Sequence, residues 1–276
     1  MKVVSFVNMK GGVGKTTLAV NVAHHLSLRL GMRVLLVDVD PQFNATQSLI
    51  NGDDYLSLRQ KNVPTIYDVF SQSQMPIISA VNGVSSVPPK KLEDIVPHNV
   101  RENFDLIPGN LEIYRIEMVA GQGTEMRLKS FLKKKAHEYD FAIIDTPPTP
   151  SVFMSSALLA SEYYVVPIKP EPMSRVGIDL LQGIINRVSE NNAHDITCAG
   201  VVITMAQENT IVFKECRKEL RADAVWKNRL LRSHIPQRTA IARDQGNQQL
   251  ILDGSDTDSK RALSNVVSQM LETING

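Results

Sequence analysis

The chain has little cysteine, and no run of residues is apolar for long enough to cross a membrane. Its two cysteines, Cys198 and Cys216, lack the spacing of a disulfide framework or of a thiolate metal site, and the six histidines are scattered. The first apolar run begins at the second or third residue, which leaves no room for a cleavable signal. We therefore expect a cytoplasmic protein with free thiols.

The chain also has no large excess of positive or negative charge. Its 30 lysines and arginines nearly balance 29 acidic residues and leave a formal net charge of +1. A polyanion would therefore have to bind a local basic patch, since the overall field of the protein is weak. No polar linker divides the 276 residues. The length suits one large domain over residues 1–276, with a buried sheet.

Apolar runs rich in β-branched residues alternate with helical patterns along most of the chain. The pattern predicts strands at 3–7, 33–39, 104–107, 141–145, 163–168 and 198–204, and helices at 15–30, 125–136, 152–160, 175–189 and 210–221. Such alternation predicts an α/β fold with a doubly wound, mostly parallel sheet flanked by helices. In such sheets ligands bind at the carboxyl ends of the strands.

The segment 51–100 breaks this alternation. It holds five prolines among serines and asparagines, and only short patches such as 66–70 fit a helical period; the prolines are Pro64, Pro76, Pro88, Pro89 and Pro97. We interpret the segment as an elaborated surface region rather than a second domain.

A glycine-rich loop follows the first expected strand and opens the first expected helix. Backbone NH groups and the positive end of a helix dipole bind a polyphosphate at such a turn. The pattern places Lys15 along the β- and γ-phosphates and the Thr16 hydroxyl on a magnesium ion. The expected nucleotide-binding residues of the loop are Lys10, Gly11, Gly12, Val13, Gly14, Lys15, Thr16 and Thr17.

The loop carries a second lysine. The ordinary pattern has glycine at position 9, but this chain has Met9, followed by Lys10. Most lysines are simply solvated, and a polar turn suits one. Against that reading stands the position of Lys10 inside a loop where an unneeded side chain would crowd the ligand.

Two further motifs follow in order, at residues 33–42 (Arg-Val-Leu-Leu-Val-Asp-Val-Asp-Pro-Gln) and 141–148 (Phe-Ala-Ile-Ile-Asp-Thr-Pro-Pro). Together with the loop they resemble the ParA/MinD family of deviant Walker P-loop ATPases, and most of all its ParA/Soj-type partition members. Weaker similarities at 65–69 and 104–110 extend the resemblance. It implies an ATP-dependent homodimer in which Lys10 reaches the partner's nucleotide, with weak intrinsic, magnesium-dependent hydrolysis of ATP.

Three carboxylates follow these strands. Asp38 and Asp145 lie at neighbouring strand ends, where they would hold the waters of the magnesium ion. By resemblance, Asp40 orients or activates the attacking water, so that the expected catalytic set is Lys10, Lys15 and Asp40. The alternative for Asp38 and Asp40 is turn capping before Pro41.

Other contacts are implied by resemblance alone. Glu171 lies in a segment, 168–172, that resembles one facing the partner subunit in the family, where it would touch the partner's ribose or Lys10; an exposed loop carboxylate is an equal alternative. Family position also places Met205 and Pro236 at the adenine.

Basic residues gather from position 214 onward. Lys214, Arg217, Lys218 and Arg221 share one face of an expected helix, and Arg238 and Arg243 follow. A solvated face is the alternative, since acidic residues are interspersed. The resemblance implies that these cations bind double-stranded DNA without sequence preference when ATP dimerises the protein, which would place it on the nucleoid. It also implies a ParB-like centromere-binding partner that stimulates hydrolysis.

The chain departs from the family pattern at three places. The usual aspartate-x-arginine is missing in the segment 204–209, the segment 235–238 lacks the usual arginine after proline, and Phe43 stands where glycine is usual after Gln42. The first two departures leave open which cations contact DNA.

A MinD-like ATPase that acts on a membrane, or one that positions another cargo on a protein scaffold, would use the same active-site residues. The tail 260–276 has apolar residues at helical spacing but no aromatics and only two cations, so it favours a packed terminal helix over a membrane anchor.

Overall fold

The computed structural model describes residues 1–71, 77–79, 83–85, 90–119, 123–171 and 174–276. Its main sheet has seven strands in the order β5-β6-β2-β7-β1-β8-β9. All neighbours are parallel except β5 and β6, which are antiparallel. The strands are β1 (Lys2–Phe6), β2 (Val34–Asp38), β5 (His98–Arg101), β6 (Phe104–Ile107), β7 (Phe141–Asp145), β8 (Tyr163–Ile168) and β9 (Thr197–Ile203). The predicted doubly wound sheet is confirmed.

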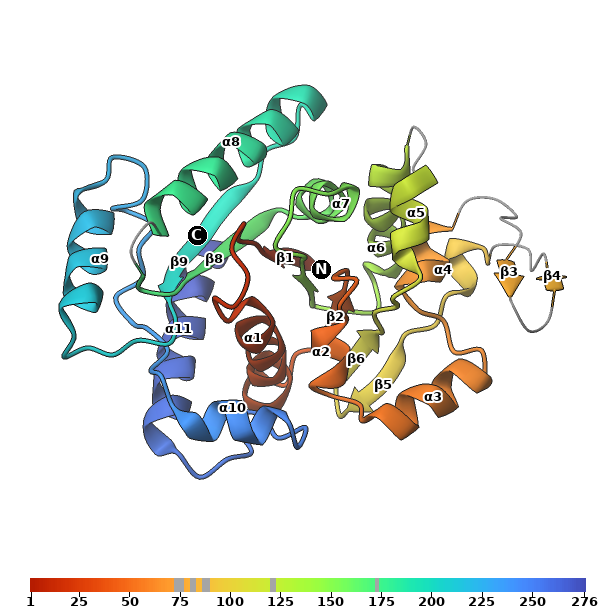
Figure 1. Ribbon diagram of the computed structural model, residues 1–276, viewed down its shortest axis with the longest axis horizontal. Coiled ribbons are helices and arrows are strands. Elements are labelled where there is room, and N and C mark those ends of the chain that lie inside the picture. Colours follow the sequence, from red (N-terminus) through yellow and green to blue (C-terminus); the bar gives the residue numbers. More distant parts are fainter. Residues whose placement is uncertain (72–76, 80–82, 86–89, 120–122, 172–173) are drawn as a thin grey trace.

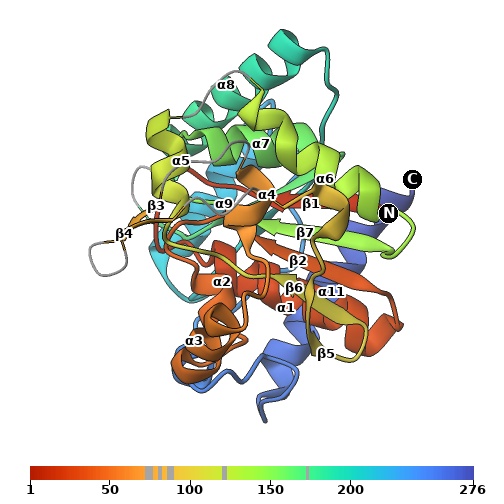
Figure 2. The ribbon, with the colours of Figure 1, turned by 90° about the vertical axis from the view of Figure 1, so that its right-hand side faces the viewer.

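Helices cover both faces of this sheet (Figures 1 and 2). On one face lie α1 (Lys15–Leu30) and α11 (Thr257–Asn275), and on the other lie α6 (Arg127–Lys135), α7 (Val152–Ala160) and α8 (Ser174–Asn192). Each face of the sheet has its own apolar core, and alternate side chains of a strand point into opposite cores. In β2, Leu36 faces α1, whereas Leu35 and Val37 face α6 and α7. Such two-sided burial explains the continuous apolar runs in the sequence.

The register of the central strands brings three sequence motifs to one edge. Asp145 at the end of β7 is the pairing partner of Phe6 on one side and of Asp38 on the other. The loop after β1 and the carboxylates of β2 and β7 therefore meet at the carboxyl edge of the sheet.

The segment 51–100 contains more regular structure than the sequence predicted. The expected helical patch at 66–70 is α4 (Ile66–Phe70), but α3 (Gly52–Gln60) was not expected. No residue of α3 is buried, so it carries no apolar period that could reveal it. Two short strands, β3 (Ile77–Ser79) and β4 (Gly83–Ser85), pair with each other, and η1 (Leu92–Asp94) follows. Pro76, Pro88 and Pro89 lie outside the described residues.

The remaining described helices lie between or beside these elements. They are α2 (Asn44–Gln47), α5 (Ile113–Val119), η2 (Thr124–Met126), α9 (Ile211–Ala222) and α10 (Thr239–Gln245). In Figure 1, α9 lies at the left edge of the molecule, beyond β9, whereas α10 lies at the bottom, near α1 and α11.

The C-terminal helix α11 is part of the core. It buries Leu263, Val266, Val267, Met270 and Ile274 against the sheet and α1. The packed terminal helix predicted from the sequence is therefore confirmed. Among the described residues, no helix has both the length and the apolarity needed to span a membrane.

Candidate active site

The glycine-rich loop forms an open cradle between β1 and α1. Gly12 and Gly14 have φ of 70° and 76°, in the left-handed region that favours glycine. A Cβ built on Gly11 or Gly12 would meet nothing within 4 Å, so the backbone there is open to a ligand. The geometry fits the predicted binding of a polyphosphate by backbone NH groups.

Asn8 fixes the start of this loop, a role for which the sequence offered no signal. Its amide nitrogen donates to the carbonyl of Pro167 in β8 (2.6 Å), and its amide oxygen accepts from the backbone NH of Lys10 (2.9 Å). The side chain is buried. The neighbouring strand therefore positions the loop through one amide.

Lys15 is buried in the cleft, with 6% of its surface exposed. Its ammonium lies 3.4 Å from the carbonyl of Lys10. Burial lowers the pKa of Lys15, and the nearby charges of Asp145 and Asp40 oppose that shift. A phosphate would bring further negative charge to this buried ammonium.

Asp145 and Asp38 form a buried pair of carboxylates at the ends of β7 and β2. The Thr16 hydroxyl donates to Oδ2 of Asp145 (2.7 Å), while Oδ1 of Asp145 is buried with no hydrogen-bond partner among the described residues. Burial raises the pKa of Asp145 to about 7, and burial and the charge of Asp145 raise the pKa of Asp38. One hydroxyl and two carboxylates are oxygen donors that suit Mg²⁺.

Thr46 holds Asp38 from behind and was missed in the sequence. Its backbone NH and its hydroxyl both donate to Oδ2 of Asp38 (2.8 Å each), and the hydroxyl oxygen accepts from the NH of Gly109 (2.7 Å). Position 109 has no room for a side chain, because a Cβ would lie 2.4 Å from Cβ of Phe43 and 3.0 Å from the Asp38 carboxyl carbon. Gly109 is distant in sequence from Thr46, so no local pattern marks this link.

Asp40 both caps a turn and lines the cleft. Its carboxylate accepts from the NH of Gln42 (2.9 Å), and its carbonyl accepts from the NH of Phe43 (2.8 Å). Asp40 therefore does cap a turn, which the sequence analysis gave as the alternative to a role in catalysis. The same side chain faces the cleft in front of the loop.

Phe43 has φ of 42°, a left-handed conformation that is rare for a bulky residue. This conformation explains why glycine suits the position. Here the ring stacks on Tyr55 (centroids 5.3 Å apart), whose hydroxyl donates to the carbonyl of Gly109 (3.0 Å). The stack joins α3 to the turn that carries Asp40.

A cleft of about 1110 Å³ opens in front of the loop. One side is the loop and Asp40, and the other is formed by the segment that leads into α3. Its lining residues include Gly11, Gly12, Lys15, Thr16, Thr17, Asp40, Phe43, Tyr55 and Met205.

Lys10 comes directly before the glycines of the loop, and 42% of its side chain is exposed. Its ammonium contacts the carboxylate of Glu171 in the same chain, and Lys169 lies 2.5 Å from the same carboxylate. The hydrogen bonds from Lys10 and Lys169 lower the pKa of Glu171 to about 2. Of the contacts expected for Glu171, the one with Lys10 is present, within a single chain.

A second cavity, of about 220 Å³, adjoins the loop. Met205 and Pro236, expected at the adenine, both line it together with Gly14 and Thr17. The hydroxyl of Thr204 donates to the carbonyl of Val13 (2.7 Å), which ties this wall to the loop. The predicted phosphate and adenine residues are therefore adjacent.

The expected DNA-binding cations fall into two separate groups. Lys214, Arg217, Lys218 and Arg221 line one groove of about 480 Å³ along α9, which we call the α9 groove. None of these four forms an ion pair with another described residue. By contrast, Arg238 pairs with Asp256 (3.3 Å) and Arg243 with Asp244 (3.0 Å). The structure therefore places four of the six predicted cations in one groove and the other two outside it.

Comparison with known proteins identifies the family of the chain. The family model AAA_31, described as an AAA domain, matches residues 1–198. The chain is 33% identical to the sporulation initiation inhibitor protein Soj of Bacillus subtilis over 232 residues, 82% of each chain. It is 30% identical to the chromosome partitioning protein ParA of Caulobacter vibrioides over 226 residues, 80% of this chain and 76% of that one.

A solved plasmid partition protein from Borrelia burgdorferi, bound to AMPPNP, has the same fold, with a TM-score of 0.77, 24% identity and 99% of each chain covered. A doubly wound parallel sheet with a phosphate-binding loop at its carboxyl edge defines the class of P-loop ATPases. Within that class, the chain belongs to the ParA/MinD family and is similar to its Soj/ParA-type partition ATPases. The resemblance seen in the sequence is confirmed.

Proposed function

We propose that the protein is a DNA partition ATPase that ATP dimerises, that binds DNA without sequence preference as a dimer, and that releases DNA after hydrolysis. The observation that carries the proposal is the pair of lysines in one loop. Lys15 is buried, whereas the side chain of Lys10 is partly exposed and therefore accessible to a second molecule.

The active-site residues suit hydrolysis of a nucleoside triphosphate. Lys15 and the loop NH groups neutralise the charge of the phosphates, and Thr16, Asp38 and Asp145 would hold Mg²⁺. When bound, the ion offsets the negative charge that develops on the phosphoryl oxygens. Asp40, fixed by the NH of Gln42, would position the attacking water at the γ-phosphate.

Dimerisation would complete the site through Lys10. To reach the partner's nucleotide, Lys10 must leave Glu171 of its own chain. A cation supplied in trans accelerates hydrolysis by about 10³- to 10⁵-fold in GTPases. Such a contribution would make hydrolysis depend on the dimer, so that ATP holds the dimer together and its hydrolysis ends it.

The α9 groove is the DNA surface we favour. None of its four cations forms an ion pair with a described carboxylate, although Glu208 also lines the groove, whereas Arg238 and Arg243 already have acidic partners. Two such grooves in a dimer would add phosphate contacts. The protein would then sit on the nucleoid in the cytoplasm, and a ParB-like centromere-binding protein would stimulate hydrolysis.

The proposal is tested with Lys15→Ala, Lys10→Ala and Asp40→Ala. Lys15→Ala should lose nucleotide binding. Lys10→Ala should bind ATP but neither dimerise nor hydrolyse it, and Asp40→Ala should bind ATP and accumulate a long-lived dimer. Light scattering after gel filtration measures dimerisation, and phosphate release measures hydrolysis. Hydrolysis by Asp40→Ala at the unsubstituted rate would refute the role of Asp40.

A further inference from the structure

The cavity beside the loop is a mostly apolar slot whose position relative to the cradle is fixed. Gly14, Thr17 and Met205 line both this cavity and the larger cleft, so a molecule can extend from one into the other. Met205 adopts φ of 48°, and a Cβ on Gly14 would lie 3.7 Å from its terminal methyl group. A left-handed methionine against the loop is the kind of local strain that gathers at ligand sites.

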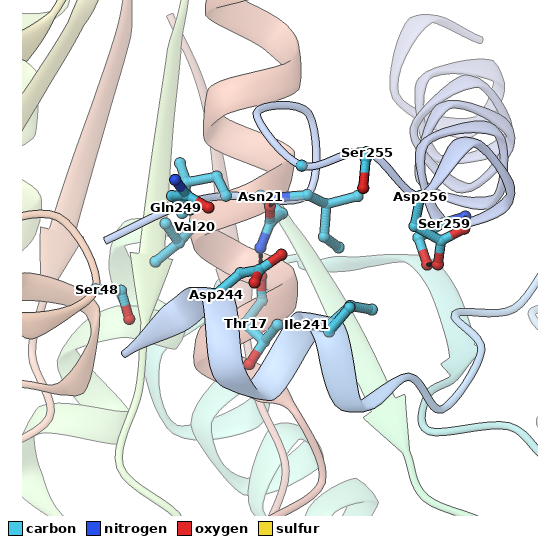
Figure 3. A pocket seen from close by; sticks show the side chains of 14 residues that line it. Thr17, Val20, Asn21, Ser48, Ile241, Asp244, Gln249, Ser255, Asp256 and Ser259 are labelled. Carbon is cyan, nitrogen blue, oxygen red and sulfur yellow. Dashed lines mark hydrogen bonds between the residues drawn. The ribbon is translucent and has the colours of Figure 1, made fainter. Parts of the chain in front are cut away.

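The far wall of the slot is tied to the first turn of α1 through Asn21, which Figure 3 shows with Thr17 at the small cavity behind this wall. The Asn21 amide nitrogen donates to the carbonyl of Thr17, and its amide oxygen accepts from the NH of Ile251, each at 2.7 Å. Ile251 and Ile241 line the slot. Behind this wall only a cavity of about 30 Å³ remains, the room of a single water molecule. The slot is therefore preformed.

One neutral amide stands out among the polar groups of the slot. The Thr204 hydroxyl is committed to Val13, and the Arg238 guanidinium pairs with Asp256. Gln237 lines the slot and accepts, at its amide oxygen, a hydrogen bond of 2.6 Å from the amide nitrogen of Gln207. The pair is exposed at the rim, where the edge of a bound ring would meet it.

We propose that Gln237, positioned by Gln207, reads the base of the bound nucleotide and selects adenine over guanine. The proposal rests on the ATPase function proposed above. A glutamine amide offers one donor and one acceptor, which match N7 and the N6 amino group of adenine. Guanine presents two acceptors, N7 and O6, at the same edge, so that the amide oxygen would face an acceptor.

The test compares ADP, GDP and 7-deaza-ADP by titration calorimetry with Mg²⁺. Diphosphates keep dimerisation out of the measurement, and 7-deaza-ADP lacks only the acceptor N7. The unsubstituted protein should bind ADP about tenfold more tightly than GDP and about threefold more tightly than 7-deaza-ADP. Gln237→Leu should remove the difference between ADP and 7-deaza-ADP, and Gln207→Leu should reduce it.

Gln60→Leu is the matched control, because Gln60 is exposed at the end of α3 and lines none of these cavities. This variant should keep the preference for ADP over GDP and over 7-deaza-ADP. The proposal is overturned if 7-deaza-ADP binds the unsubstituted protein as well as ADP does, or if Gln237→Leu keeps the difference. If the unsubstituted protein binds none of the three diphosphates, the result contradicts the proposed ATPase function instead.

Discussion

Single residues behind the catalytic groups determine their geometry, and Thr46 is the clearest case. It is fully buried, and its hydroxyl links the Asp38 carboxylate to the NH of Gly109. Thr46→Val keeps the shape but leaves both partners buried without that hydroxyl. We expect the free energy of unfolding to fall by about 1–3 kcal/mol in urea denaturation.

Thr46→Ser is the control for this prediction. It retains the hydroxyl and loses only a methyl group, so it should unfold closer to the unsubstituted protein than Thr46→Val does. Equal stability of the two variants would show that the hydroxyl does not matter.

Glu171 gives a second prediction at this scale. Its contact with Lys10 within one chain competes with any contact of Lys10 in a dimer. In the Asp40→Ala background, Glu171→Gln should therefore let ATP form the dimer at lower protein concentration. The pair is partly exposed, so the dimer dissociation constant should fall by no more than about fivefold.

Sedimentation at several protein concentrations measures this shift. Lys169→Gln serves as the control, because it leaves the contact between Lys10 and Glu171 in place. A weaker dimer in Glu171→Gln would contradict the competition and would favour a contact of Glu171 with the partner subunit.

Among the elements, α9 carries the prediction for DNA. Lys214→Gln, Lys218→Gln and Arg221→Gln together should weaken binding to a non-specific duplex and reduce the slope of log affinity against log salt by about 0.9 for each lost phosphate contact. Arg217 stays intact, because its guanidinium donates to the carbonyl of Arg232 (3.1 Å) and so supports the local structure.

Arg243→Gln is the matched control. Arg243 already pairs with Asp244, so its loss should leave the salt slope unchanged. ATP-dependent dimerisation should be normal in the triple variant and in the control. If the salt slope changes only in the control, the DNA-binding surface lies on α10 and not on α9.

The elements differ in how far the sequence could predict them. The helix 15–30 was predicted with its bounds because Gly14 and Gly31, both left-handed, delimit it, and the central strands were predicted because both their faces are buried. The exposed α3 and the antiparallel strand β5 lacked such a signal. The loop motif and the strand-end aspartates predicted the core of the site. Asn8 and Thr46 could not be predicted, because each links the site to a distant segment, Asn8 to Pro167 and Thr46 to Gly109.

At the scale of the whole molecule, the buried position of His24 should make the free energy of unfolding depend on pH. It is buried on α1, lies 3.2 Å from the Arg101 guanidinium and 3.8 Å from the Asp253 carboxylate, and packs on Phe104. Burial first and then the charge of Arg101 lower its pKa to about 4. The folded state therefore binds fewer protons than the unfolded state between about pH 4 and 6.5.

It follows that His24 opposes folding as the pH falls through this range, by about 3 kcal/mol at the lower end. His24→Gln should flatten the acid side of the stability profile in urea denaturation at a series of pH values. His137→Gln, at an exposed position, should leave the profile as it is. An unchanged slope in His24→Gln would show that other groups cause the loss of stability in acid.

The central claim is that ATP switches DNA binding on, and binding to a non-specific duplex tests it most directly. The purified protein is titrated with ATP, with ADP and without nucleotide, each across a salt series. We predict binding only with ATP, with an affinity that falls steeply as salt rises. Equal binding in all three states, or no binding in any state while ATP is hydrolysed, would contradict the claim.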